Sequence, residues 1–167
     1  MGTASISYVS TSGSKGTYEV GKGYFGYGGS YSSCYATYKF TLPATASKVS
    51  ISLNVSTLGQ EQTYAFRIDT SSSNTEDFTS QGTFTGEKGY DSGYKELTYS
   101  FSRTASFSAT TYYIHLRCDS SNAGYFYFRS GTVTYTEASY TVTFNPNGGS
   151  TTKTSQTGTS VTLPTKS

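Results

Sequence analysis

The chain has 167 residues, a formal net charge of +2, 13% charged residues and 34% hydrophobic residues. Serine and threonine supply about a third of it, and the aromatic residues are 17 tyrosines and 10 phenylalanines, without tryptophan. The scarcity of Ala, Leu, Glu and Lys argues against a helical protein, while Val, Ile, Thr, Tyr and Phe favour strands. The aromatic content also argues against a disordered chain. The composition therefore predicts an all-β protein.

The distribution of charge and hydropathy limits the partners that the sequence suggests. The 12 lysines and arginines do not cluster, so the electrostatic footprint of a nucleic-acid-binding protein is missing. No apolar run approaches the roughly 20 residues of a membrane span. The sequence also lacks the charged start and apolar stretch of a secretory signal. We therefore expect neither nucleic-acid binding nor membrane insertion.

Apolar and polar residues alternate with a period of two along much of the chain, as in strands with one buried face. In chain order the clearest runs are residues 34–40, 49–55, 64–68, 97–101 and 112–118, then a long or bent strand over 126–135. That last strand is interrupted near Ser130 and Gly131. Weaker runs occur at 4–9, 18–20 and 82–85, and no segment has a convincing helical period.

About eight to ten short antiparallel strands in the first 138 residues predict a β-sandwich of jelly-roll type. Aliphatic residues are few, so Phe and Tyr are expected to fill the core. The Ser- and Thr-rich faces of the strands are expected to be solvated.

The character of the sequence changes near residues 137–139, which predicts a sandwich domain over 1–138 and a second unit over 139–167. This unit reads as a strand at 140–144, an Asn-Pro-Asn-Gly-Gly turn, a polar loop and a strand at 160–164. The segments YTVTFNPNGG and SVTLP resemble the start of an internalin-type B repeat, a β-grasp-like module of bacterial surface proteins and some phage structural proteins. The resemblance implies a partial β-grasp-like repeat, because the family's closing Gly-Trp is missing. Residues 1–138 are only generally similar to the jelly-roll sandwiches of carbohydrate-binding modules and virion fibres.

Little in the sequence points to catalysis or metal binding. His115, the single histidine, alternates with Ile114 and Leu116, so we expect it to face solvent, and no nucleophile or carboxylate partner is indicated. The acidic residues show no paired-carboxylate motif. Residues 69–77 carry oxygen ligands that would suit Ca²⁺, but a solvated loop is the preferred interpretation. We therefore predict no enzyme activity, no cofactor and no metal site.

Cys34 and Cys118 both have the parity of core-facing residues on their strands. They form either a disulfide or two buried thiols, and the sequence leaves both alternatives open. A bridge closing a loop of this length would contribute roughly 4–5 kcal/mol in the chain-entropy model.

Two sets of aromatic residues are candidates for ligand binding. If the strands around 112–117 and 125–129 form a hairpin, one of its faces carries a ladder of aromatic and cationic side chains suited to sugar stacking. The ladder consists of Tyr113, His115, Arg117, Tyr125, Tyr127 and Arg129. The second set, Tyr24, Tyr27 and Tyr31, lies among glycines and is either displayed on a tight loop or part of a turn-rich strand.

The sequence as a whole favours a non-enzymatic protein of a phage virion surface, such as a fibre, tail or decoration component. Its expected partners are other virion or surface proteins, further copies of itself and a host-surface glycan. The alternative is a bacterial cell-surface adhesin or carbohydrate-binding module, including an accessory domain of a secreted glycosidase.

Overall fold

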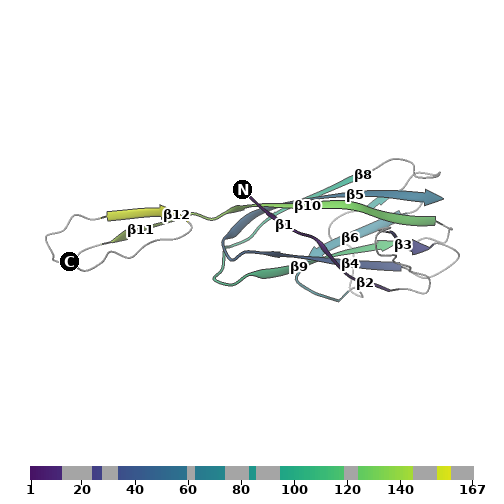
Figure 1. Ribbon diagram of the computed structural model, residues 1–167, viewed down its shortest axis with the longest axis horizontal. Helices are drawn as coiled ribbons and strands as arrows, with labels where there is room; N and C mark the ends of the chain where they lie inside the picture. Colours follow the sequence, from purple (N-terminus) through teal and green to yellow (C-terminus); the bar gives the residue numbers. More distant parts are fainter. Residues whose placement is uncertain are drawn as a thin grey trace.

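The computed structural model describes residues 1–12, 24–27, 34–59, 63–73, 83–85, 95–118, 124–144 and 154–158. Within these ranges the chain is all-β, without a helix. Two antiparallel sheets form the two layers of a sandwich, and a separate two-stranded sheet extends from one end of it (Figure 1). This architecture confirms the predicted all-β sandwich.

The first sheet has the strand order β1–β10–β5–β8, and β3 also pairs with β10. These strands are β1 (Gly2–Ala4), β10 (Gly124–Glu137), β5 (Ala46–Gly59), β8 (Lys95–Ser102) and β3 (Tyr24–Tyr27). The second sheet has the order β2–β4–β9–β6–β7. Its strands are β2 (Ser7–Ser12), β4 (Cys34–Leu42), β9 (Thr110–Cys118), β6 (Thr63–Asp69) and β7 (Thr83–Thr85).

The strand pairing is that of a jelly roll. Antiparallel ladders join β1 to β10, β4 to β9, β5 to β8 and β6 to β7. If β2 and β3 are left out, the first strand therefore pairs with the last, the second with the second-last, and so on to β6 and β7. The chain is thus connected as one long antiparallel hairpin. The β10–β5 and β6–β9 ladders then roll this hairpin into two sheets. Such a double sheet is the jelly-roll arrangement that the strand count predicted.

Each clear alternating run of the sequence lies within a strand of the structure. The weak run at 4–9 instead contains the passage between the sheets, because β1 ends at Ala4 in the first sheet and β2 begins at Ser7 in the second. The weak run at 82–85 contains β7. The run at 18–20 lies outside the described residues.

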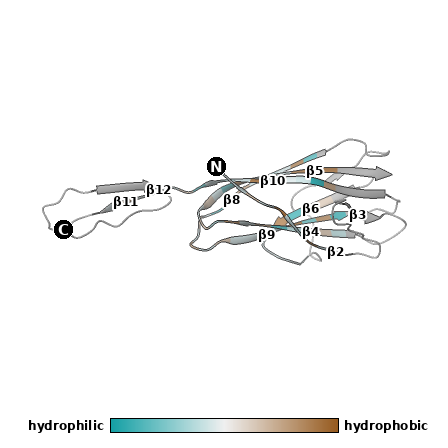
Figure 2. Ribbon diagram, in the orientation of Figure 1, coloured by the Kyte–Doolittle hydropathy of each residue, from teal (hydrophilic) through white to brown (hydrophobic). Residues whose placement is uncertain are grey.

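The core lies between the two sheets and is built from the apolar half of each alternation (Figure 2). Among the described residues, Tyr38, Phe40 and Phe66 are buried, but most other buried apolar side chains are aliphatic. The expectation that aromatic residues fill the core is therefore only partly right. Several aromatic residues instead pack around an aliphatic centre, partly buried: Tyr99, Phe101, Tyr112, Phe128 and Tyr135.

The long strand β10 is bent where the sequence predicted an interruption. Its register with β5 shifts between Phe128 and Ser130, so Arg129 is the additional residue of a β-bulge. Because of the bulge, Phe128 before it and Val133 after it both face the core. Val133 is buried, and the ring of Phe128 stacks on Tyr38 at a centroid distance of 4.3 Å.

Gly131 follows the bulge in a tightly packed position. A Cβ atom there would lie 2.6 Å from Ile6 Cδ1, 3.0 Å from Leu53 Cδ2 and 3.1 Å from Phe128 Cζ. We expect Gly131→Val to lower the free energy of unfolding by about 1–3 kcal/mol, the usual cost of overpacking a core. Denaturant unfolding measures this change, with exposed Ser130→Ala as the neighbouring control. Equal stability of the two variants would contradict the packing described for Gly131.

The third sheet consists of β11 (Tyr140–Phe144) and β12 (Thr154–Gly158), paired in antiparallel register. The position of β11 agrees with the predicted strand at 140–144. The polar loop predicted between the two strands of the tail is wrong for residues 154–158, because threonine-rich polar segments form strands when a neighbour supplies the ladder. The strand predicted at 160–164 lies outside the described residues.

Candidate functional site

The outer face of the first sheet is a regular array of short polar side chains. The registers of β10, β5 and β8 place polar residues in four consecutive rows across the three strands. The rows are Thr136–Lys48–Ser102, Thr134–Ser50–Ser100, Thr132–Ser52–Thr98 and Ser130–Asn54–Glu96. We call these residues the hydroxyl face.

The hydroxyl face follows from the alternation of the sequence. On β5, Val49, Ile51 and Leu53 face the core at 1–2% exposure, so the intervening residues must face outward. Strand geometry spaces the outward side chains by about 4.8 Å across the strands and about 6.7 Å along them. The array therefore presents hydrogen-bonding groups at the scale of single sugar rings.

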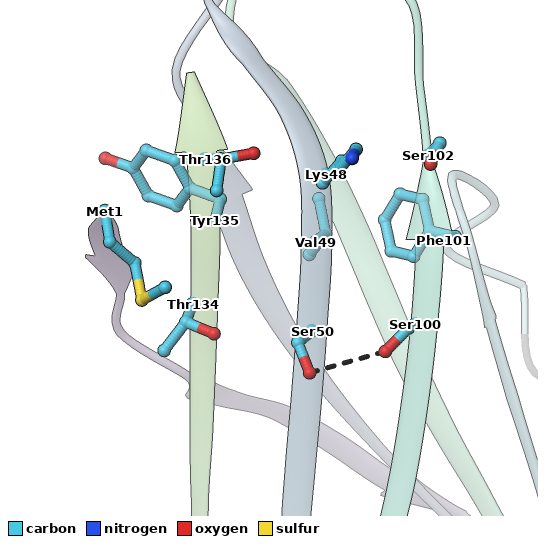
Figure 3. Close-up of a pocket in the computed structure, with 10 residues that line it drawn as sticks. All are labelled: Met1, Lys48, Val49, Ser50, Ser100, Phe101, Ser102, Thr134, Tyr135 and Thr136. Carbon is cyan, nitrogen blue, oxygen red and sulfur yellow. Dashed lines mark hydrogen bonds between the residues drawn. The ribbon is translucent and has the colours of Figure 1, made fainter. Parts of the chain in front are cut away.

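A groove of about 470 Å³ lies at one end of this face (Figure 3). Its polar lining is the first two rows of the hydroxyl face: Lys48, Ser50, Ser100, Ser102, Thr134 and Thr136. Met1, Val49, Phe101 and Tyr135 complete the lining. The groove has the volume of a small-molecule site. Polar side chains from three adjacent strands line it on the outer face, while the side chains of Val49, Phe101 and Tyr135 belong to the core-facing row between them.

Hydrogen bonds tie the strands together across the hydroxyl face. Ser100 Oγ donates to Ser50 Oγ at 3.4 Å, at the floor of the groove (Figure 3). Beyond the groove, Ser52 Oγ donates to Glu96 Oε1 at 2.5 Å and Asn54 Nδ2 donates to Ser130 Oγ at 3.2 Å. The polar groups are thus held in place by their neighbours, but a hydroxyl retains further donor or acceptor capacity for a ligand.

The predicted hairpin of β9 and β10 does not form. Strand β9 lies between β4 and β6 in the second sheet, whereas β10 lies between β1 and β5 in the first. Tyr113, His115 and Arg117 are consequently in the other sheet from Tyr125, Tyr127 and Arg129. The prediction of one shared aromatic ladder is wrong. The alternation of β9 is as compatible with β4 and β6 as neighbours as it is with β10, so it does not determine which strands pair with β9.

His115 is fully buried, at 0% exposure, so the expectation that it faces solvent is also wrong. It does lie opposite Ile114 and Leu116, on the outer face of the second sheet, but the chain after β6 contacts it there. His115 Nε2 lies 2.8 Å from the carbonyl oxygen of Ser71, and Nδ1 lies 3.0 Å from Thr37 Oγ1. A carbonyl only accepts, so Nε2 donates to Ser71, and Nδ1 and the Thr37 hydroxyl form the second hydrogen bond.

Arg67 and Asp69 complete this buried polar cluster beside His115. Arg67, at 4% exposure, forms an ion pair with Asp69, with Nε 2.6 Å from Oδ2, and donates through Nη2 to the Ser73 carbonyl. Asp69 Oδ1 also accepts from the backbone N–H of Ser71 at 2.9 Å, forming an Asx turn. These contacts hold the segment after β6 against the outer face of the second sheet and commit the Asp69 carboxylate to protein partners.

The remaining candidate residues are placed only in part. Tyr24 and Tyr27 lie on β3, which pairs with β10, so these two residues are in a strand and not in a loop. Tyr31 lies outside the described residues. Cys34 and Cys118 are directly opposite each other in the β4–β9 ladder.

The groove was not predicted, although the sequence held a signal for it. The polar residues of β5 and β8 were expected on solvated faces, and they are there. Their alignment into rows depends on the strand order, which the alternation does not determine.

Comparison with family models, curated proteins and solved structures gave no match. Within the described part of the chain, no helix has the length and hydrophobicity of a membrane span. Across the same residues, no group of three or more His, Cys, Asp or Glu side chains is placed to hold a metal ion.

Proposed function

We propose that this chain is a non-enzymatic surface protein that binds a glycan on its hydroxyl face. The observation that carries the proposal is the groove of Figure 3, in which serine and threonine side chains from three adjacent strands surround one space. Sugar hydroxyls both donate and accept hydrogen bonds, and serine and threonine hydroxyls complement them in both roles.

The buried state of His115 agrees with a non-enzymatic role. Both ring nitrogens contact protein groups, so this histidine is not poised to act on an external substrate. His115 is the single histidine of the chain, the residue most often used as a general base near neutral pH.

We further propose a virion exterior as the setting of this protein, with self-association and contacts to other virion proteins. Jelly rolls recur in viral capsid proteins and in lectins, which makes this setting an analogy at the level of the fold. A bacterial cell surface is the alternative setting. The glycan-binding proposal is the same in both.

Removal of three groove hydroxyls tests the function. In the variant Ser50→Ala/Ser100→Ala/Thr134→Val, we expect affinity for glycans retained by the native protein on a glycan array to fall at least about tenfold, because each lost hydrogen bond costs roughly 0.5–1.5 kcal/mol. Biolayer interferometry with the strongest binder of the array measures the change.

The matched control is Thr41→Val/Thr111→Val on the second sheet. These exposed hydroxyls lie 2.9 Å apart, so the control removes a comparable pair far from the groove. The control should bind like the native protein, and all three proteins should have the same unfolding midpoint. Equal binding by the groove variant and the native protein would refute the proposed site.

A further inference from the structure

Lys48 gives the groove a single charged side chain. It is exposed, and it is the one charged side chain in the groove lining described above. Among the described residues Lys48 has no ion pair. Its ammonium group is therefore available to a ligand, and Figure 3 shows it beside Thr136 and Val49 at one end of the groove.

Two hydroxyl residues flank Lys48 in the register. Thr136 on β10 and Ser102 on β8 are its partners in the same row, on strands that lie about 4.8 Å to either side of β5. A carboxylate placed against the ammonium group can accept hydrogen bonds from such hydroxyls as well. A neutral sugar can accept hydrogen bonds from the ammonium group, but it carries no opposite charge to add to them.

The carboxylate on the hydroxyl face lies at its other end. Glu96 belongs to the row of Asn54, six residues along β5 from Lys48, which corresponds to about 20 Å. Charges separated by more than the Debye length of about 8 Å are largely screened at physiological salt. Glu96 also accepts a hydrogen bond from Ser52. Glu96 is therefore too distant to weaken the attraction at Lys48, and it disfavours acidic groups at its own end. Glu137 follows Thr136 at the Lys48 end, but it pairs with Ala46 outside the groove lining and accepts a hydrogen bond from Thr45 Oγ1 at 3.1 Å.

From this arrangement we propose that the groove selects acidic glycans, those carrying a uronic or sialic acid, and that the ligand carboxylate binds between Lys48, Ser102 and Thr136. This inference rests on the proposed glycan-binding function. The opposite charges at the two ends of the hydroxyl face also orient the ligand, with its acidic sugar in the groove and its neutral part extended toward Asn54.

Matched pairs of glycans test the selectivity. Affinities for 3′-sialyllactose and lactose, and for tetragalacturonate and its carboxyl-reduced form, are measured for the native protein and for Lys48→Gln at 50 and 500 mM NaCl. We expect the native protein to prefer at least one acidic member. Lys48→Gln should lower that affinity about two- to fivefold, as an exposed ion pair allows, and lower the affinity for the neutral member by less, so that the preference for the acidic member is lost. The added salt should have the same effect as the substitution.

The outcomes separate the two proposals. Binding of neutral glycans that requires Ser50 and Ser100 but not Lys48 would overturn acidic selectivity and leave the glycan-binding function standing. Binding of acidic glycans that Lys48→Gln does not weaken would likewise overturn the inference. Equal Lys48-dependent binding of a single-stranded DNA of matched charge would show attraction of any polyanion and contradict glycan selection. If no glycan on the array binds, both proposals fail.

Discussion

Replacement of His115 by alanine is expected to lower the free energy of unfolding by about 3 kcal/mol. The side chain is fully buried and bridges β4, through Thr37, to the segment after β6, through the Ser71 carbonyl. Its removal leaves a cavity and deprives buried Thr37 and the part-buried Ser71 carbonyl of their partner, and both effects destabilise the folded state. Urea unfolding followed by tyrosine fluorescence measures the loss.

Two further variants separate the hydrogen bonds from the volume of the side chain. Thr37→Val nearly preserves volume and removes only the hydroxyl that is hydrogen-bonded to His115 Nδ1, so we expect it to cost about 1 kcal/mol. Lys39→Gln, at an exposed position on the same strand, should change stability by less than about 0.5 kcal/mol. If His115→Ala resembled Lys39→Gln, the buried cluster would not stabilise the second sheet.

Oxidation of Cys34 and Cys118 to a disulfide is expected to stabilise the protein by roughly 4–5 kcal/mol. The two residues are direct partners in the antiparallel β4–β9 ladder, where Cα atoms lie about 4.5–5.5 Å apart. That separation falls within the range that a disulfide spans. The register therefore favours the bridge over two separate thiols, the alternative that the sequence left open.

Alkylation followed by mass spectrometry, with and without prior reduction, determines the state of the two cysteines. The oxidised protein should resist alkylation until it is reduced, and its urea midpoint should drop on reduction. Cys34→Ser/Cys118→Ser should match the reduced protein and show no response to reductant. Two freely alkylated thiols after exposure to oxidised glutathione would contradict the prediction.

The strands themselves could be predicted from the sequence, because each alternating run reports its own buried face. Val49, Ile51 and Leu53 are buried as their spacing indicates, and the break near Ser130 is a β-bulge. A sandwich of jelly-roll type could also be predicted from the number of short antiparallel strands that must each bury one face, but without its strand pairs. These features depend on local pattern and on the number of strands.

The neighbours of each strand could not be predicted, because parity assigns a face but not a partner. Ile114 and Leu116 on β9 fit Phe128 and Phe126 in a hairpin as well as they fit their actual partners on β4 and β6. His115 shows a second limit. Its outward parity was right, but its burial comes from Ser71 and the chain around it, which are distant in sequence.

The candidate site likewise depends on which strands are neighbours. Outward-facing Ser50 on β5 was predicted, but the groove exists only because β10 and β8 place Thr134 and Ser100 beside it. A binding surface that spans three strands from distant parts of the chain is a property of the strand order. A single sequence indicates its components and not their assembly.

The most direct test of the central claim is to map where a glycan binds. Amide chemical shifts of the labelled protein are followed as the strongest oligosaccharide from the array is added. If the glycan binds to the hydroxyl face, the largest amide chemical-shift changes should occur at Lys48, Ser50, Ser100 and Thr134, on three strands of the first sheet. Changes centred on Tyr113 and Arg117 in the second sheet, or on β3, would contradict the account.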